Sequence, residues 1–140
     1  MTNGCNLIVK ERARQVSDEN WTPQHDDQHA DGDLAMAAAC YAAPNLIYHR
    51  PFTRDWKGKR CYPINCIEVV DPWPWDERWD KRMVYGANRD SGSNVIPDPE
   101  TYSDSERLDL LVKAGALIAA EIDKLLRQQS RTDKVLKGGD

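Results

Sequence analysis

Apolar residues recur at helical intervals in three stretches of the chain and lose that periodicity between the second and the third. The three predicted helices cover residues 7–19, 33–43 and 104–128. Spacings of three and four residues place apolar side chains on one face of a helix, which then packs against a core. The pattern therefore predicts a mainly α fold.

The first two predicted helices differ in their apolar faces. The narrow stripe of the first consists of Val9, Ala13 and Val16. The second is rich in alanine, the best helix former, and Pro44 ends it. We expect Asp31 or Asp33 to cap its N-terminus, where a carboxylate also suits the helix dipole.

The third predicted helix carries the clearest local signals. Ser103 and Glu106 have the spacing of a capping box. A broad apolar stripe follows, made of Leu108, Leu111, Val112, Gly115, Ile118, Ala119, Ile122, Leu125 and Leu126. Two pairs of opposite charge four residues apart are expected on the outer face: Asp109 with Lys113, and Asp123 with Arg127.

Gly115 lies in the middle of this helix among alanines. Glycine there costs about 1 kcal/mol relative to alanine, so its presence indicates the close approach of another helix. The alanine-rich helix at 33–43 is the expected partner. The alternative is a second copy of the chain, which would make a homo-oligomer through the Gly115 face.

The remaining sequence defines the domain. Seven of the eight prolines fall between residues 44 and 102, which excludes long helices there. Short strands are expected at 65–70 and 82–85. We expect one globular domain over residues 1–129, with a Pro/Trp-rich insert at 44–102 that is irregular or forms short β-strands. Residues 130–140 are expected to form a flexible tail that frays.

Composition narrows the functional classes. The 140 residues carry a net charge of −4, which argues against general nucleic-acid binding. No apolar run approaches the roughly 18 residues of a membrane helix, so no membrane partner is expected. The first residues do not resemble a signal peptide, which predicts a cytoplasmic protein with reduced thiols. Cys61 and Cys66 lack the spacing of a zinc site.

One segment concentrates potential metal ligands: His25, Asp26, Asp27, His29, Asp31 and Asp33. If Thr22 and Pro23 start a short helix, His25 and His29 lie on one face at a spacing that binds a transition metal. Two other interpretations stay open. The acids cap helices and satisfy backbone donors, or His25 and its neighbours form a polar loop that binds a ligand or partner.

Charge is unevenly distributed around this segment. Residues 15–49 contain no Lys or Arg, whereas five basic residues fall between Arg50 and Arg60. The acidic and the basic segment are expected to face each other and stabilise the fold by their opposite charges. Alternatively, the basic segment binds an anion such as phosphate. Arg50, Arg54 and Arg60 are the candidate phosphate ligands, because the guanidinium group suits bidentate contact.

Five tryptophans form a second group of interest: Trp21, Trp56, Trp73, Trp75 and Trp79. In Trp73-Pro74-Trp75 a stiff backbone holds two indoles toward one side. Trp21 and Trp75 are expected in the core. Trp73 and Trp79 are the candidates for stacking on a base.

Three blocks of the sequence resemble a family of small phage and prophage proteins. The blocks are WTPxHDDxH from Trp21 to His29, the WPW of residues 73–75, and LVKAGALIAAEI at 111–122. Relative to that family, residues 81–101 look like an insertion. The resemblance implies an accessory phage protein in the host cytoplasm. Small accessory phage proteins often inhibit host defence, either by binding a defence protein or by sequestering its nucleotide signal.

No Gly-rich phosphate loop, GxSxG motif or activated cysteine is present, so we favour a non-catalytic binding protein without a cofactor. Its expected ligand is nucleotide-like. The candidate ligand-binding residues are Arg50, Arg54, Arg60, Trp73, Trp79, His25, Asp26 and Asp27. One alternative is a metal-dependent nucleotide phosphohydrolase that uses the histidines and aspartates of residues 25–29. Another is an inhibitor that binds a host protein through its acidic face.

If the acids of this segment only cap helices, no metal should occupy His25 and His29. Chelation with EDTA should then leave the melting temperature unchanged, and the purified protein should carry no stoichiometric metal. A melting temperature lowered by several degrees, together with a bound metal found by elemental analysis, would instead establish a metal site.

Overall fold

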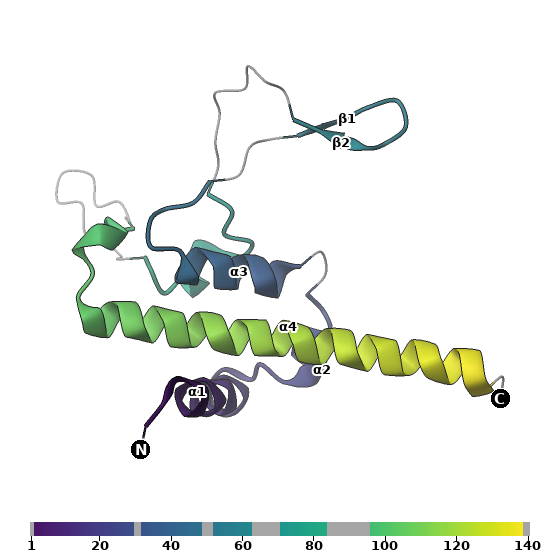
Figure 1. Ribbon diagram of the computed structural model, residues 1–140, viewed down its shortest axis with the longest axis horizontal. Helices are drawn as coiled ribbons and strands as arrows, with labels where there is room; N and C mark the ends of the chain where they lie inside the picture. Colours follow the sequence, from purple (N-terminus) through teal and green to yellow (C-terminus); the bar gives the residue numbers. More distant parts are fainter. Residues whose placement is uncertain (1, 30–31, 49–51, 63–70, 84–95, 139–140) are drawn as a thin grey trace.

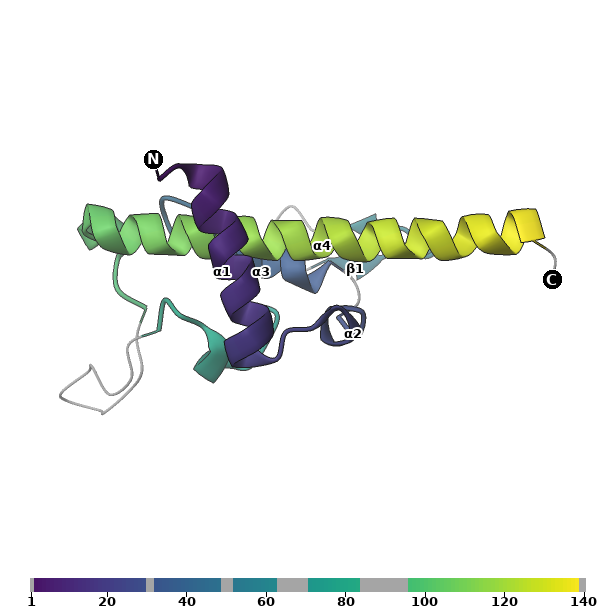
Figure 2. The ribbon, with the colours of Figure 1, turned by 90° about the horizontal axis from the view of Figure 1, so that it is seen from below.

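The computed structural model describes residues 2–29, 32–48, 52–62, 71–83 and 96–138. This part is mainly helical, which confirms the predicted fold class. Its elements in chain order are α1 (Gly4–Glu19), α2 (Pro23–Asp26), α3 (Asp33–Ala42), β1 (Thr53–Arg54), β2 (Arg60–Cys61), η1 (Glu77–Trp79), η2 (Pro99–Thr101) and α4 (Asp104–Gly138). α4 spans the molecule, with α3 along one side and α1 on the other (Figure 1). Turned by 90°, the structure shows α1 crossing α4 steeply (Figure 2).

The core lies between α3 and α4, as the two alanine-rich stretches predict. Its buried residues are Trp21, Leu34, Ala37, Ala38, Tyr41, Leu110, Ala114, Leu117 and Ala120. Alanines on both helices let the backbones approach closely, and the larger side chains fill the space beside them. This small core places the other elements around α3 and α4.

Arg107 of α4 joins the two helices through polar contacts as well. Its Nη1 donates to the backbone oxygens of Tyr41 at 3.2 Å and Ala43 at 3.1 Å, and its Nη2 donates to that of Ala42. The last carbonyls of a helix have no partner within the helix, and a cation there also suits the dipole. Arg107 therefore caps the C-terminus of α3, which ends just before Pro44 as predicted.

The predicted N-terminal cap of α3 is wrong. Gly32 occupies the cap position with a φ of 76° and forms no side-chain capping bond. Asp33 is the first residue of the helix, where its charge still suits the dipole. Asp31 lies outside the described residues.

Two predictions of local structure in α4 are confirmed. Glu106 N donates to Ser103 Oγ at 3.1 Å, and Ser103 N donates to a Glu106 carboxylate oxygen at 3.2 Å, which completes the capping box. Lys113 contacts Asp109 at 3.2 Å. Arg127, however, binds Asp27 instead of Asp123.

α4 is longer than its periodicity predicts. The expected end near residue 128 is wrong, because the helix continues to Gly138 and includes most of the stretch expected to fray. Neither proline nor glycine occurs between Gln128 and Gly138, so the sequence offers nothing to stop the helix earlier. This C-terminal part extends beyond the other elements (Figures 1 and 2).

The predicted apolar stripes do not form the core. Six residues of the α4 stripe are between 43% and 56% exposed: Leu108, Leu111, Ile118, Ile122, Leu125 and Leu126. The alanine face of α4 lies against α3 instead, because small side chains allow the closer approach. In α1, Val9 is 69% exposed, whereas Gln15 is buried. Periodicity identified these helices correctly and their buried faces incorrectly.

Gly115 is the point where α1 crosses α4. A Cβ atom built on Gly115 would lie 2.5 Å from Ile8 Cδ1 and 2.7 Å from Ile8 Cγ1. The predicted close approach is confirmed, but its partner is Ile8 of α1 rather than α3. Since Ile8 of the same chain occupies this face, the packing does not favour a homo-oligomer through Gly115.

The insert contains a short antiparallel hairpin in which Thr53 pairs with Cys61 and Arg54 with Arg60. A short-β insert is therefore confirmed, although at other residues than predicted. The strand expected at 65–70 lies outside the described residues, as do residues 84 and 85 of the other, while Arg82 and Met83 are not in a strand. Cys5, Cys40 and Cys61 are free thiols, and Cys66 is not described. No helix in the described part is long and apolar enough to cross a membrane.

Gly115→Leu is expected to lower the free energy of unfolding by about 1–3 kcal/mol, because the new side chain overlaps Ile8. Shortening Ile8 to Ala in the same chain should recover part of the loss, since the two substitutions are coupled. Urea unfolding of both single variants and the double variant measures this coupling. Strictly additive effects would show that Ile8 does not contact Gly115.

Candidate aromatic binding site

A cavity of about 330 Å³ lies where the end of α1, the region of α2 and the segment around η1 meet. Its lining residues are Glu19, Trp21, His25, His29, Trp75, Asp76 and Trp79. Five of these seven side chains are aromatic rings. The cavity thus collects three of the tryptophans and both histidines that the sequence singled out, although their sequence separation gave no indication that they meet.

Four of the rings form a closed circuit of contacts. Trp21 stacks on His25 with centroids 5.9 Å apart, and His25 meets the His29 ring at 4.8 Å. His29 lies 4.9 Å from Trp75, which returns to Trp21 at 5.9 Å. Each ring supports its neighbours, so the circuit forms a preorganised aromatic wall. Trp79 is 45% exposed and completes the lining without joining the circuit.

Local sequence places the two histidines. Asn20 adopts the left-handed conformation with a φ of 57° and ends α1. Thr22 then caps α2 by accepting a hydrogen bond from His25 N at 3.2 Å, and Pro23 occupies the first turn. The predicted short helix is confirmed. It ends at Asp26, so His29 lies beyond the helix, although the rings of His25 and His29 are in contact.

A buried ion pair fixes α2 against α1. Asp26 is 0% exposed, and its Oδ2 accepts a hydrogen bond from Arg12 Nη2. Arg12 Nη1 also donates to the backbone oxygen of Trp21 at 3.2 Å. The guanidinium group therefore neutralises a buried carboxylate and holds Trp21, one of the four rings of the aromatic wall.

α4 holds the other side of this turn. Asp27 accepts hydrogen bonds from Arg127 Nη2 at 2.7 Å and Arg131 Nη2 at 3.0 Å, and these contacts lower the pKa of Asp27. The Nζ atom of the buried Lys124 donates to the backbone oxygen of His29. The chain around the histidines is thus attached to both long helices.

These contacts correct two interpretations of the acidic segment. Asp26 and Asp27 bind arginine side chains, and no described backbone N–H group bonds to either carboxylate, which does not fit the interpretation that these acids satisfy backbone donors. The acidic segment does not pair with the basic hairpin either, because its described partners lie on α1 and α4. Within the described ranges, no group of three or more His, Cys, Asp and Glu side chains is arranged to hold a metal.

The segment from residue 71 to 82 supplies Trp75, Asp76 and Trp79 to the lining of the cavity. Arg82 is buried and donates from Nε to Asp80 Oδ1 at 3.1 Å and from Nη2 to Asp80 Oδ2 at 2.9 Å. Tyr41 of α3 donates its hydroxyl to the backbone oxygen of Trp79 at 3.3 Å and accepts from Lys81 N at 3.0 Å. The core helix thereby positions Trp79.

Trp73 does not line the cavity, although its sequence context made it a candidate ligand-binding residue. Its ring lies 5.2 Å from that of Tyr41 and 5.5 Å from that of Trp75, and the guanidinium of Arg82 lies 5.7 Å from its centroid. The expectation that the WPW indoles share one side is confirmed. Trp73 packs against the core and supports Trp75.

Acidic groups dominate the charge of the cavity. Glu19 and Asp76 line it, and no Lys or Arg is among its described lining residues. Burial, with the nearby His25, lowers the pKa of His29, so His29 is neutral at neutral pH. Glu19 contacts Arg14 at 3.3 Å and Lys81 at 3.6 Å.

The basic residues of the insert lie on the hairpin. Arg54 and Arg60 stand over the Phe52 ring at 5.4 Å and 4.3 Å, and Arg50 is outside the described residues. Every described hydrogen bond and ring contact of the hairpin stays within residues 52–62. The structure therefore brings these arginines together without joining them to Trp73 or Trp79.

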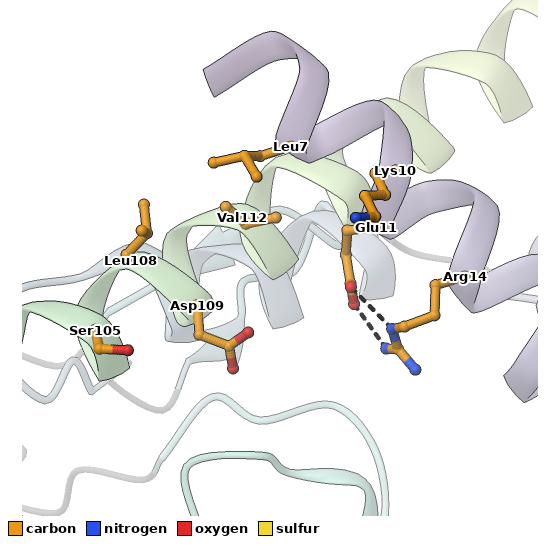
Figure 3. A pocket seen from close by; sticks show the side chains of 8 residues that line it. All are labelled: Leu7, Lys10, Glu11, Arg14, Ser105, Leu108, Asp109 and Val112. Atoms are coloured by element: carbon orange, nitrogen blue, oxygen red, sulfur yellow. Dashed lines mark hydrogen bonds and ion pairs between the residues drawn. The ribbon is translucent and has the colours of Figure 1, made fainter. Parts of the chain in front are cut away.

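A second cavity of about 370 Å³ lies in the angle between α1 and α4 (Figure 3). Leu7, Leu108 and Val112 supply its apolar part. Among its charged side chains, Arg14 contacts Glu11 at 2.6 Å and Asp109 contacts Lys113 at 3.2 Å. Its described lining residues include no aromatic ring, so the aromatic cavity is the better candidate site for a flat ligand.

Arg12→Met is expected to lower the free energy of unfolding by about 3–5 kcal/mol, because it leaves the buried Asp26 carboxylate unpaired. Adding Asp26→Leu should recover most of that loss, since the uncompensated charge is removed. Arg131→Met, at a largely exposed ion pair, is the control and should have a far smaller effect. Equal losses for Arg12→Met and Arg131→Met in chemical denaturation would contradict this assignment.

Comparison of the chain with protein-family models, with curated proteins and with solved structures finds no match. The function of the aromatic cavity is therefore argued from its own chemistry.

Proposed function

We propose that this protein is a non-catalytic binding protein whose ligand inserts a flat ring or another apolar group into the aromatic cavity. The observation that carries the proposal is the circuit of four rings beside a cavity of about 330 Å³. This volume lies in the range of small-molecule sites, which are mostly apolar and contain a few polar groups. Here Glu19 and Asp76 supply the polar groups.

The described side chains favour binding over catalysis. Cys40 is buried, and burial raises its pKa to about 11, the opposite of what a nucleophilic thiol needs. Asp26 and Asp27 are engaged by arginines, which leaves them poorly suited to hold the metal of a phosphohydrolase. The same ion pairs neutralise much of the acidic face through which an inhibitor would bind a host protein.

A nucleotide-like ligand fits this proposal through its base. Stacking of a base on an aromatic side chain contributes about 1–3 kcal/mol, and Trp79 is the exposed ring at the rim. Binding of the phosphate of such a ligand was expected at Arg54 and Arg60. The described contacts of these two residues are confined to the hairpin. If the resemblance to phage and prophage proteins reflects relationship, the binding of such a ligand would act by sequestration, as a counter-defence.

Titration calorimetry with a panel of nucleosides, nucleotides and other heteroaromatic compounds tests the proposal. We expect at least one ligand to bind and Trp79→Ala to weaken it roughly five- to 150-fold, the equivalent of one lost stacking contact. Trp56→Ala is the matched control, because Trp56 is 89% exposed on the hairpin. Circular dichroism establishes that both variants are folded.

Mass spectrometry of the released ligand separates binding from catalysis. Recovery of the intact compound is expected, whereas a hydrolysed product would contradict a non-catalytic role. Unchanged affinity in folded Trp79→Ala would remove the aromatic cavity as the site. A loss of affinity in Arg54→Ala that requires the ligand's phosphate would show that the hairpin contributes an anion site after all.

A further inference from the structure

We infer that the aromatic cavity selects an organic cation, namely a nitrogen that carries methyl groups or a delocalised positive charge, over neutral and anionic groups of the same shape. The inference rests on the proposed binding function and assigns a charge to the group that enters the cavity. Two kinds of ligand carry such a cation: a small methylated ammonium compound, and a nucleoside with an N-methylated base. Both present the same poorly hydrated positive charge to the cavity.

Aromatic faces are dense around the cavity. Trp21, Trp75 and Trp79 line the cavity together with both histidine rings. The face of an aromatic ring carries partial negative charge, and tryptophan is the strongest partner for a cation within about 6 Å of the ring. A methylated cation interacts with such faces without requiring hydrogen-bond acceptors for every N–H group.

The charges in the lining of the cavity are negative. The charged lining residues are Glu19, whose side chain is 16% exposed, and Asp76, whose side chain is 53% exposed. The basic groups near them approach from outside the lining: Arg14 and Lys81 contact Glu19, and Arg78 contacts Asp76 at 3.4 Å. Both carboxylates thus belong to the lining, whereas their basic partners do not.

The His29 ring adds no positive charge to the cavity at neutral pH. His29 is half-buried between His25 and Trp75, and both burial and His25 keep its pKa below the ordinary histidine value. At neutral pH His29 therefore presents an uncharged ring and does not repel a cation. A phosphate or carboxylate would find no Lys or Arg among the described lining residues. The electrostatic preference of the cavity is therefore for positive charge.

Matched pairs of probes test this preference at neutral pH. Choline is compared with its neutral isostere, in which a tert-butyl group replaces the trimethylammonium group. A cationic N-methylated purine nucleoside is compared with its unmethylated parent. Binding to the full chain is measured by calorimetry up to millimolar concentrations. The aliphatic and purine pairs distinguish the two sources of the cation.

We expect at least one cation to bind tenfold or more tightly than its neutral partner, since a desolvated cation–π contact of about 2 kcal/mol corresponds to roughly 30-fold in affinity. Asp76→Asn should reduce this preference. The amide retains an oxygen that accepts the capping bond from Arg78 N at η1, so the local structure is conserved. Trp79→Ala should reduce cation binding, and Trp56→Ala should leave it unchanged.

The outcomes separate this inference from the proposed function. Equal binding of a cation and its isostere, both sensitive to Trp79→Ala, would overturn the charge preference and leave an aromatic binding site. Failure of every cation to bind while a neutral or anionic heteroaromatic compound does bind would also overturn it. A preference that is the same in folded Asp76→Asn would reject the assigned role of that carboxylate.

Discussion

The close contact of α3 with α4 positions the segment that carries Trp79. Alanines on both helices bring the two backbones together, and Arg107 ties the C-terminal carbonyls of α3 to α4. Tyr41 stands at that end of α3, where its hydroxyl bonds the backbone of residues 79 and 81. A displacement of α3 would therefore move one wall of the aromatic cavity, although no residue of α3 lines it.

Ion pairs of arginine side chains hold parts of the structure in place where the apolar core is too small to do so. The core contains few large residues, while much of the apolar surface of α4 is exposed. Arg12 joins the α2 turn to α1, Arg127 joins it to α4, and Arg82 binds Asp71 and Asp80 within the segment that carries Trp75 and Trp79. A buried ion pair contributes little net stability compared with apolar residues of the same size, but its geometry specifies one arrangement. The aromatic wall benefits from that specificity, because the α2 turn has no core of its own.

Local signals predicted local structure well. The capping box of α4, the short helix after Thr22 and the contact between His25 and His29 all depend on residues a few positions apart. The buried face of α4 was not predictable in this way, because both of its faces carry apolar residues and the choice depends on how closely α3 approaches. The partners of the acidic segment were equally hidden, since Arg12 and Arg127 lie 14 and 100 residues from the aspartates they bind. The contact between His29 and Trp75 could likewise not be predicted, because only the tertiary fold brings these two residues together.

The hairpin has a consequence for how this chain tolerates change. The contacts that hold α3 to α4 span 64 to 66 residues, so the segment between them is a long loop closed by the helices. The entropic cost of closing a loop rises slowly with its length, by about 0.6 kcal/mol for each doubling. Because the described contacts of residues 52–62 are internal, an insertion at the hairpin tip near Gly58 should cost the helical frame little. That tip is a natural place to graft a peptide tag or to exchange one loop sequence for another, whereas the same change between Asp71 and Arg82 would remove the supports of Trp75 and Trp79.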